Sequence, residues 1–129
     1  SKQGETALDI AAYAAHMAAL LGAHIIKVKP PADSLEQPEA TSVYQATNLP
    51  RDTLAERINH IMQASFAGRR IVVFSGGAAK DRDGLLNEVR ALRDGGANGS
   101  IIGRNTFQRP RDEALDLLGD IIDIYRGKL

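Results

Sequence analysis

The stretch Arg70-Ile-Val-Val-Phe-Ser-Gly-Gly77 joins a run of apolar residues to a glycine pair. Two similar stretches occur in the chain, Ala23-His-Ile-Ile-Lys-Val-Lys-Pro30 and Gly99-Ser-Ile-Ile-Gly-Arg-Asn105. Short β-branched runs bounded by Gly, Pro or polar residues are typical of buried strands. A helical pattern follows each of them, which predicts repeated βα units and a parallel sheet. We expect helices to cover both faces of that sheet.

Amphipathic helical patterns precede the first strand and follow each strand. The first pattern, residues 6–21, is rich in alanine, whose small side chain allows close packing against a sheet, and Gly22 ends it. Asp52 or Thr53 is placed to cap the second, and Pro110 opens the last. The predicted buried positions, in chain order, are Leu8, Ala11, Ala12, Ala15, Ala18 and Leu20 or Leu21; Leu54, Ile58, Ile61, Met62 and Ser65; Leu85, Leu86, Val89 and Leu92; and Ala114, Leu115, Leu118, Ile121, Ile122 and Tyr125.

Residues 1–129 are expected to form a single segment, because this length can bury a real core. Two α/β architectures fit the pattern: an open flavodoxin-like sheet, or the C-terminal portion of a (β/α)8 TIM barrel, about strands six to eight. A complete barrel needs about 250 residues, and three strands cannot close one. The chemistry at the strand ends favours the barrel portion. Ser1 leads almost at once into a helical pattern, so the start looks like a cut or processed end.

The connection after the first strand, residues 30–50, is long and polar. Connections of this length in compact domains are commonly lids or binding loops. The alternative is a solvated insertion without a role. We predict a long βα loop, in which Tyr44 is a candidate proton donor that the sequence does not place.

Composition excludes several classes of function. Sixteen Lys and Arg balance sixteen Asp and Glu, and without a basic run nucleic-acid binding has little support. The chain has no cysteine, which excludes disulfides and fits a reducing compartment. No apolar run reaches the ~18 residues of a membrane span and no signal peptide is visible, so we expect a cytoplasmic protein. The histidines have no carboxylate at ligand spacing, and we predict no metal site.

Lys27 follows Ile25 and Ile26 where the first strand gives way to prolines. A lysine attacks a carbonyl carbon only as the neutral amine, a form that desolvation or a nearby positive charge favours. Lys29 lies on the same face of the strand, roughly 6–7 Å away, and is the candidate for that charge. The plainer alternative is one lysine extended into solvent and one paired with a carboxylate. We predict that Lys27 is catalytic.

The next two strands end in residues suited to phosphate. Ser75 supplies a hydroxyl, while Gly76 and Gly77 let backbone N–H groups approach an anion with no Cβ in the way. Gly103 exposes another amide, and the Arg104 guanidinium can bind phosphate through two nitrogens. A tight turn or a surface arginine explains each motif alone, but the last two βα loops of a barrel are the habitual phosphate site. Together with the lysine, they predict an enzyme that forms an imine with a phosphorylated carbonyl compound.

Three stretches also resemble a known family: GAHIIKVKPP (22–31), VVFSGGAAKD (72–81) and RDGGANGSIIGRNTFQRP (93–110). They are similar to the bacterial and archaeal class I fructose-bisphosphate aldolases of the DhnA type. The resemblance spans almost the whole chain and implies a TIM barrel, of which this chain is similar to the fifth helix and strands six to eight with their helices.

The resemblance implies reversible cleavage of fructose 1,6-bisphosphate to dihydroxyacetone phosphate and glyceraldehyde 3-phosphate, a lyase reaction of glycolysis and gluconeogenesis. Lys27 would form the Schiff base with the phosphorylated sugar. The iminium polarises the substrate, so no metal or other cofactor is expected. The residues implied to bind phosphate are Ser75, Gly76, Gly77, Gly103 and Arg104.

The family's carboxylate on the first barrel strand and its proton-transferring tyrosine near the fifth lie upstream of this sequence. We therefore expect the isolated chain to be inactive and to need a missing N-terminal barrel segment or other subunits, with a homo-oligomer as the expected form. One alternative is a related lysine-dependent aldolase or acyltransferase of the same barrel group, acting on another phosphorylated ketose. Another is an inactive phosphate-binding fragment. A nucleotide-binding sheet has less support, because the glycine pair lacks the G-x-G-x-x-G and P-loop patterns.

Overall fold

The computed structural model describes residues 2–129, and Ser1, where the sequence suggests a processed end, lies outside this range. Three parallel strands form one sheet in the order β1 (Ile25–Val28), β2 (Ile71–Ser75) and β3 (Gly99–Ile101). Lys27 pairs with Val73, and Val73 with Gly99, so the carboxyl ends of all three strands lie at one edge. The predicted parallel α/β sheet is confirmed.

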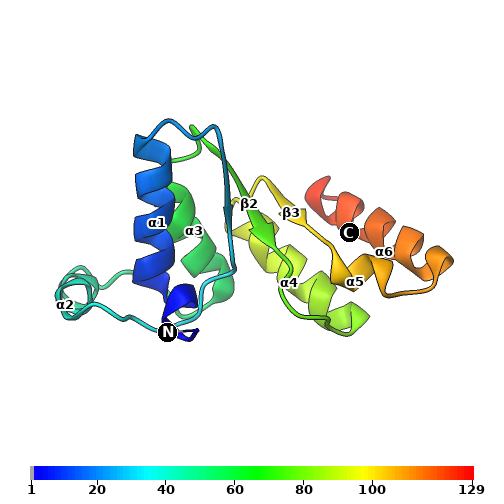
Figure 1. Cartoon of the computed structure of the whole chain (residues 1–129), viewed down its shortest axis with the longest axis horizontal. Coiled ribbons are helices and arrows are strands. Elements are labelled where there is room, and N and C mark those ends of the chain that lie inside the picture. The colour runs from blue at the N-terminus through cyan, green and yellow to red at the C-terminus, as the bar shows by residue number, and fades with distance from the viewer. Residues whose placement is uncertain (1) are drawn as a thin grey trace.

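Helices pack beside one another along the sheet (Figure 1). α1 and α3 lie side by side at one end of the molecule, α6 lies at the other end, and the sheet and α4 lie between them. No helix among the described residues has the length and apolar character needed to cross a membrane. The helices are η1 (Gly4–Thr6), α1 (Leu8–Leu20), α2 (Pro38–Ala46), α3 (Leu54–Ala64), α4 (Arg82–Asp94), α5 (Arg104–Phe107) and α6 (Arg111–Tyr125).

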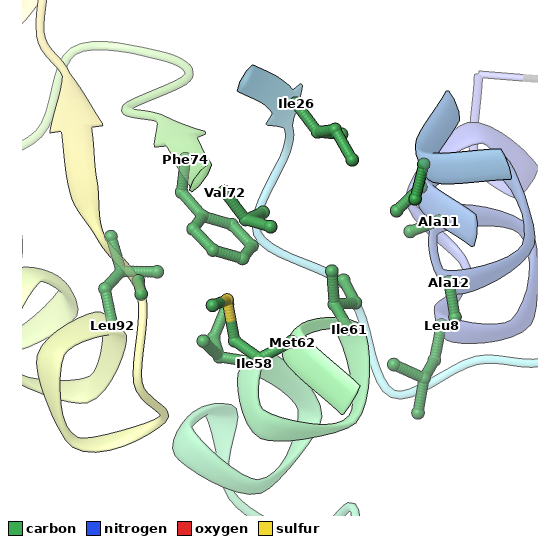
Figure 2. Packing of buried hydrophobic residues seen from close by; sticks show 13 residues of the cluster. Leu8, Ala11, Ala12, Ile26, Ile58, Ile61, Met62, Val72, Phe74 and Leu92 are labelled. Atoms are coloured by element: carbon green, nitrogen blue, oxygen red, sulfur yellow. The ribbon is translucent and has the colours of Figure 1, made fainter. Parts of the chain in front are cut away.

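The core lies on one face of the sheet (Figure 2). Ile26, Val72 and Phe74 point from the strands toward α1, α3 and α4 and are at most 5% exposed. The alternate residues Ile25 and Ile71 are 63% and 48% exposed, because side chains along a strand alternate between faces. The expectation that helices cover both faces is therefore wrong for the described residues. The uncovered face is the one that a closed barrel turns inward.

The middle helices match the predicted pattern. In α3, Thr53 forms a capping box with Glu56, and Ile58, Ile61 and Met62 are buried. All the apolar residues predicted to be buried in α4 are buried. A capping box together with one apolar stripe is a strong local signal, so these helices could be read from the sequence alone.

α1 faces the core as predicted except at its C-terminal end, whereas α6 is rotated from the predicted orientation. In α1 the alanine face packs inward, and the bulkier Leu20 and Leu21 are 64% and 88% exposed. In α6 the predicted core residues Leu115 and Ile122 are about half exposed, while Leu117 is fully buried. The reason in α6 is its partner: it packs on α4 and α5, so its contact face differs from that of a helix lying on a sheet.

The connection predicted as a loop over residues 30–50 contains the helix α2, which stands outside α1 in Figure 1. None of the residues of α2 is fully buried. Tyr44 ties it to α3 through a hydrogen bond of 2.6 Å between its hydroxyl and the His60 Nε2. The sequence showed no helix here because α2 lacks an apolar stripe and depends on tertiary contacts.

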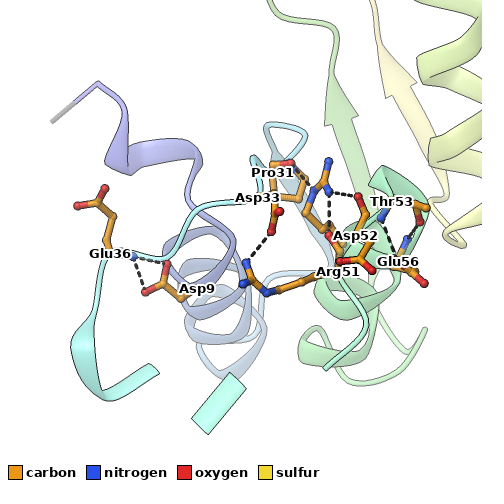
Figure 3. A network of polar contacts seen from close by, with 9 residues as sticks. Asp9, Pro31, Asp33, Glu36, Arg51, Asp52, Thr53 and Glu56 are labelled. Atoms are coloured by element: carbon orange, nitrogen blue, oxygen red, sulfur yellow. Dashed lines mark hydrogen bonds and ion pairs between the residues drawn. The ribbon is translucent and has the colours of Figure 1, made fainter. Parts of the chain in front are cut away.

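Polar contacts fasten both ends of this connection (Figure 3). The buried Asp9 carboxylate accepts backbone N–H groups of Glu36, at 3.1 Å, and Gln37, at 2.8 Å, just before α2. The Arg57 guanidinium donates to the backbone carbonyl of Pro31, at 3.1 Å, before α2, and to that of Arg51, at 2.8 Å, after α2. The connection is therefore a fixed part of the structure.

We expect Asp9→Ala to loosen this connection selectively, since it leaves two N–H groups without their charged acceptor. The loss should be about 1.5–3 kcal/mol of local stability. Native-state hydrogen exchange should show faster exchange at the amides of residues 36–46. Asp112→Ala is the matched control, because its side chain is 96% exposed. Unchanged exchange at residues 36–46 would contradict the anchoring role of Asp9.

Candidate active site

The carboxyl ends of the three strands surround an open cavity of about 350 Å³. All the residues predicted for the site line this cavity, and the structure brings them together from separate βα units. A larger cavity of about 510 Å³ lies against α3, but neither Lys27 nor Lys29 lines it. The residues lining the strand-end cavity are Lys27, Lys29, Ser75, Gly76, Gly77, Ile101, Gly103, Arg104, Asn105 and Phe107.

Lys27 lies in β1 opposite Val73 and projects from the uncovered face of the sheet. Among the described residues it takes part in no ion pair. Lys29 lines the same cavity, as the two-residue spacing predicts, but its ammonium pairs with the Glu5 carboxylate. The hydrogen bond from Lys29 and its positive charge lower the pKa of Glu5. Glu5 thus partly compensates the charge that Lys29 is predicted to present to Lys27.

The glycine turn after β2 differs in detail from the prediction. The Gly76 N–H donates to the Ile101 carbonyl at 3.2 Å, so it continues the sheet and does not face the cavity. The expectation that this amide approaches an anion is wrong in this conformation. Gly77 has φ +66, a left-handed conformation that favours glycine, and a Cβ there would meet nothing within 4 Å. The open side of the turn is therefore at Gly77.

Arg104 reaches across from the third βα unit to this turn. Its guanidinium donates to the Gly77 carbonyl at 3.0 Å and is exposed to solvent. A guanidinium has five N–H donors, and this is its one hydrogen bond among the described residues. Arg104 and Gly77 therefore form one continuous rim of the cavity.

Three residues that line the cavity were not predicted for the site: Ile101, which the sequence indicated only as a strand residue, Asn105 and Phe107. Asn105, only 3% exposed, lies beneath the glycine turn, and Phe107 stands 72% exposed at the mouth. Asn105 and Phe107 lie within three residues of Gly103-Arg104, in the short helix α5, which carries no amphipathic pattern. The sequence carried no signal for Asn105, because its burial and its backbone partners exist only in the folded chain.

Tyr44, the candidate proton donor, is not among the residues that line this cavity. Burial raises its pKa, with a smaller contribution from the Asp9 charge. Burial lowers the pKa of its partner His60. Among the described residues, no three His, Cys, Asp or Glu side chains gather where they could hold a metal ion. The strand-end cavity thus offers amines, a guanidinium, a hydroxyl and backbone groups, which suit imine chemistry and anion binding.

Comparison with known proteins agrees with this chemistry. The chain is 30% identical over 129 residues to a probable class 1 fructose-bisphosphate aldolase of Chlamydia muridarum, covering 93% of this chain and 36% of that protein. It is 35% identical over 107 residues to a class 1 fructose-bisphosphate aldolase of Halobacterium salinarum, covering 82% of this chain and 32% of that protein. The chain thus spans about a third of the curated relatives it matches.

Solved structures show the same likeness. An archaeal fructose 1,6-bisphosphate aldolase superposes with a TM-score of 0.71 and 27% identity, covering 96% of this chain and 40% of that one. A structure described as a Schiff-base-forming fructose-1,6-bisphosphate aldolase superposes with a TM-score of 0.70 and 27% identity, covering 95% of this chain and 39% of that one. A fructose-bisphosphate aldolase from Slackia heliotrinireducens superposes with a TM-score of 0.64 and 28% identity, covering 97% of this chain and 38% of that one.

The family model that matches residues 2–109 is described as the DeoC/LacD family of aldolases. It covers all three strands, the glycine turn and the Gly-Arg turn. The resemblance read from the sequence is confirmed. This chain belongs to the DeoC/LacD aldolase family, and its fold is the C-terminal part of the TIM barrel of the archaeal aldolases.

Proposed function

We propose that this chain carries the Schiff-base lysine and the phosphate-binding loops of a class I aldolase that cleaves fructose 1,6-bisphosphate reversibly. The observation that carries the proposal is that Lys27, Gly77 and Arg104 line one cavity although they come from three different βα units. Relatives with this name match almost the whole chain. The products are dihydroxyacetone phosphate and glyceraldehyde 3-phosphate.

In this reaction the neutral Lys27 Nζ attacks the C2 ketone to form a carbinolamine. Its hydroxyl takes a proton from an acid group and leaves as water, which gives a protonated imine. A base removes the C4 hydroxyl proton, the C3–C4 bond breaks, and its electron pair moves into the imine to form an enamine. Glyceraldehyde 3-phosphate leaves. Protonation at C3 and hydrolysis then release dihydroxyacetone phosphate and the free amine. The iminium provides the polarisation of the substrate at this step.

A substrate phosphate is proposed to lie at the rim formed by Gly77 and Arg104. The free guanidinium donors supply charge-assisted hydrogen bonds, and Gly77 leaves room for close backbone approach. Ser75 and Gly103 line the same cavity and add a hydroxyl and an exposed turn. Gly76 contributes by shape, since a Cβ there would stand 3.4 Å from the Asn105 side chain. Lys29 remains the proposed source of positive charge near Lys27.

The acid and base groups of the reaction are proposed to come from further barrel strands, in the same protein or in a partner chain. β1 and β3 are both sheet edges, and Ile25, Ile71 and Ile101 lie exposed beside Lys27. Adding strands to these edges would close the barrel over that face. We also propose a cytoplasmic homo-oligomer acting in glycolysis and gluconeogenesis.

A second candidate is a related lysine-dependent aldolase or acyltransferase acting on another phosphorylated ketose. This candidate is supported by the family to which the chain belongs, because DeoC/LacD aldolases are not defined by a single substrate. Borohydride trapping with each candidate substrate distinguishes the two. A chain that binds phosphosugars and forms no trapped adduct in any assembly would instead be a binding module.

Lys27 should be the imine-forming residue. Incubating the active assembly with dihydroxyacetone phosphate and borohydride should place the reduced adduct on Lys27, because reduction fixes the imine as a stable secondary amine. Peptide mass spectrometry locates the adduct. Lys27→Gln should abolish trapping. The matched control is Lys29→Gln, two residues further along in the same cavity, which should retain an adduct at Lys27. Labelling at Lys29 or Lys80 would overturn the assignment.

Arg104→Ala should weaken the use of bisphosphate substrate roughly 30- to 150-fold. This corresponds to the loss of about 2–3 kcal/mol from a charged, bidentate contact. Reaction with unphosphorylated dihydroxyacetone should change little. Arg111→Ala is the control, since its side chain is 85% exposed and lies outside the cavity. Equal losses for phosphorylated and unphosphorylated substrates would show that Arg104 acts structurally.

The purified 129-residue chain should associate with itself and turn over substrate negligibly. Two open sheet edges and an exposed apolar face favour association, and the proposed acid and base groups lie elsewhere. Light scattering and an aldolase assay test both points on one sample. A monodisperse monomer with substantial cleavage activity would contradict this expectation.

A further inference from the structure

The two anion-binding turns are fastened together by one buried amide. The Asn105 Nδ2 donates to the Ala78 carbonyl at 3.1 Å and lies 3.5 Å from the Gly76 carbonyl. The Asn105 Oδ1 accepts the Lys80 N–H at 2.7 Å. A single side chain thus contacts the beginning, the middle and the end of the glycine turn.

Arg109, one turn further along, supports the same arrangement. Its Nε donates to the Asn105 backbone carbonyl and its Nη2 donates to the Lys80 backbone carbonyl, each at 2.7 Å. The backbone of Lys80 is therefore held on both sides, its N–H by Asn105 and its carbonyl by Arg109. In the described chain, every side-chain hydrogen bond to the backbone of residues 76–80 comes from Arg104, Asn105 or Arg109.

The chemistry of these contacts requires an amide. The turn presents carbonyls, which need a donor, and an N–H, which needs an acceptor, and Asn supplies both from one planar group. An aspartate of the same shape keeps the acceptor but cannot donate when ionised. It also places a negative charge beneath the proposed phosphate position, where like charges repel.

We propose that Asn105 is the positioning residue of the phosphate site: it fixes the distance between Gly77 and Arg104 so that one anion meets both. This inference rests on the proposed function, because it concerns the same site. It assigns Asn105 no contact with substrate. Its effect passes through the turn at Gly77, where a Cβ would meet no other atom within 4 Å, so that the hydrogen bonds from Asn105 hold the turn in place.

The test is calorimetric titration of inorganic phosphate into the full 129-residue chain, with amide NMR shifts used to locate binding. Wild type should show shifts at Gly77 and Arg104. Asn105→Asp should weaken binding about ten- to a hundredfold, the size expected when a binding group is misplaced by about 1 Å. Arg109→Lys keeps the charge but loses the two directed bonds, and should give a smaller loss in the same direction.

Asn98→Ala is the matched control for stability. The Asn98 Oδ1 accepts the Val72 N–H at 2.8 Å, a similar side-chain to backbone bond, but at the amino end of β3. Its loss should lower the melting temperature and leave phosphate affinity within about twofold of wild type. In the active assembly, Asn105→Asp should reduce borohydride trapping with dihydroxyacetone phosphate and spare trapping with unphosphorylated dihydroxyacetone.

The outcomes separate the two proposals. If wild type binds phosphate at Gly77 and Arg104 and Asn105→Asp binds equally well, the positioning role is overturned and the proposed function stands. An equal loss of affinity in Asn98→Ala would also overturn it, by showing that general destabilisation is the cause. If wild type gives no phosphate-dependent shifts at the turn, the proposed phosphate site fails, and the role of Asn105 fails with it.

Discussion

Parallel pairing in register is the constraint on which the site depends. Lys27 pairs with Val73 and Val73 with Gly99, which places three strand ends and the turns that follow them at one edge. Residues as far apart in the chain as Lys27 and Phe107 thereby share one small cavity, although they come from three βα units. A shift of one residue in β1 would turn Lys27 toward the helices and bury its ammonium in the core.

Much of this arrangement could be predicted from local sequence. The β-branched runs around Ile26 and Val72, the cap at Thr53 and the apolar stripe of α4 each specify their structure within a few residues. The residues at the strand ends could likewise be predicted, because parallel βα units bring those ends together whatever the helices do.

The parts that could not be predicted depend on distant partners. α2 has no stripe of its own and is held by Asp9 and His60, which belong to other elements. The orientation of α6 follows from packing on α4, so Leu117 replaced the predicted Leu115 in the core. Asn105 is missed for the same reason: its partners are backbone groups of residues 76–80, which only the folded chain places around it.

The placement of α2 has a consequence for how this fold can vary and be handled. None of the residues of 30–50 lines the strand-end cavity, and α2 is tied to the body by contacts near its two ends. Its outward surface, including Val43 at 58% exposure, is thus separated from the chemistry. Insertions and changes of composition at that surface can accumulate without reaching the lysine. The same surface is a suitable attachment point for a fluorophore or an immobilisation tag.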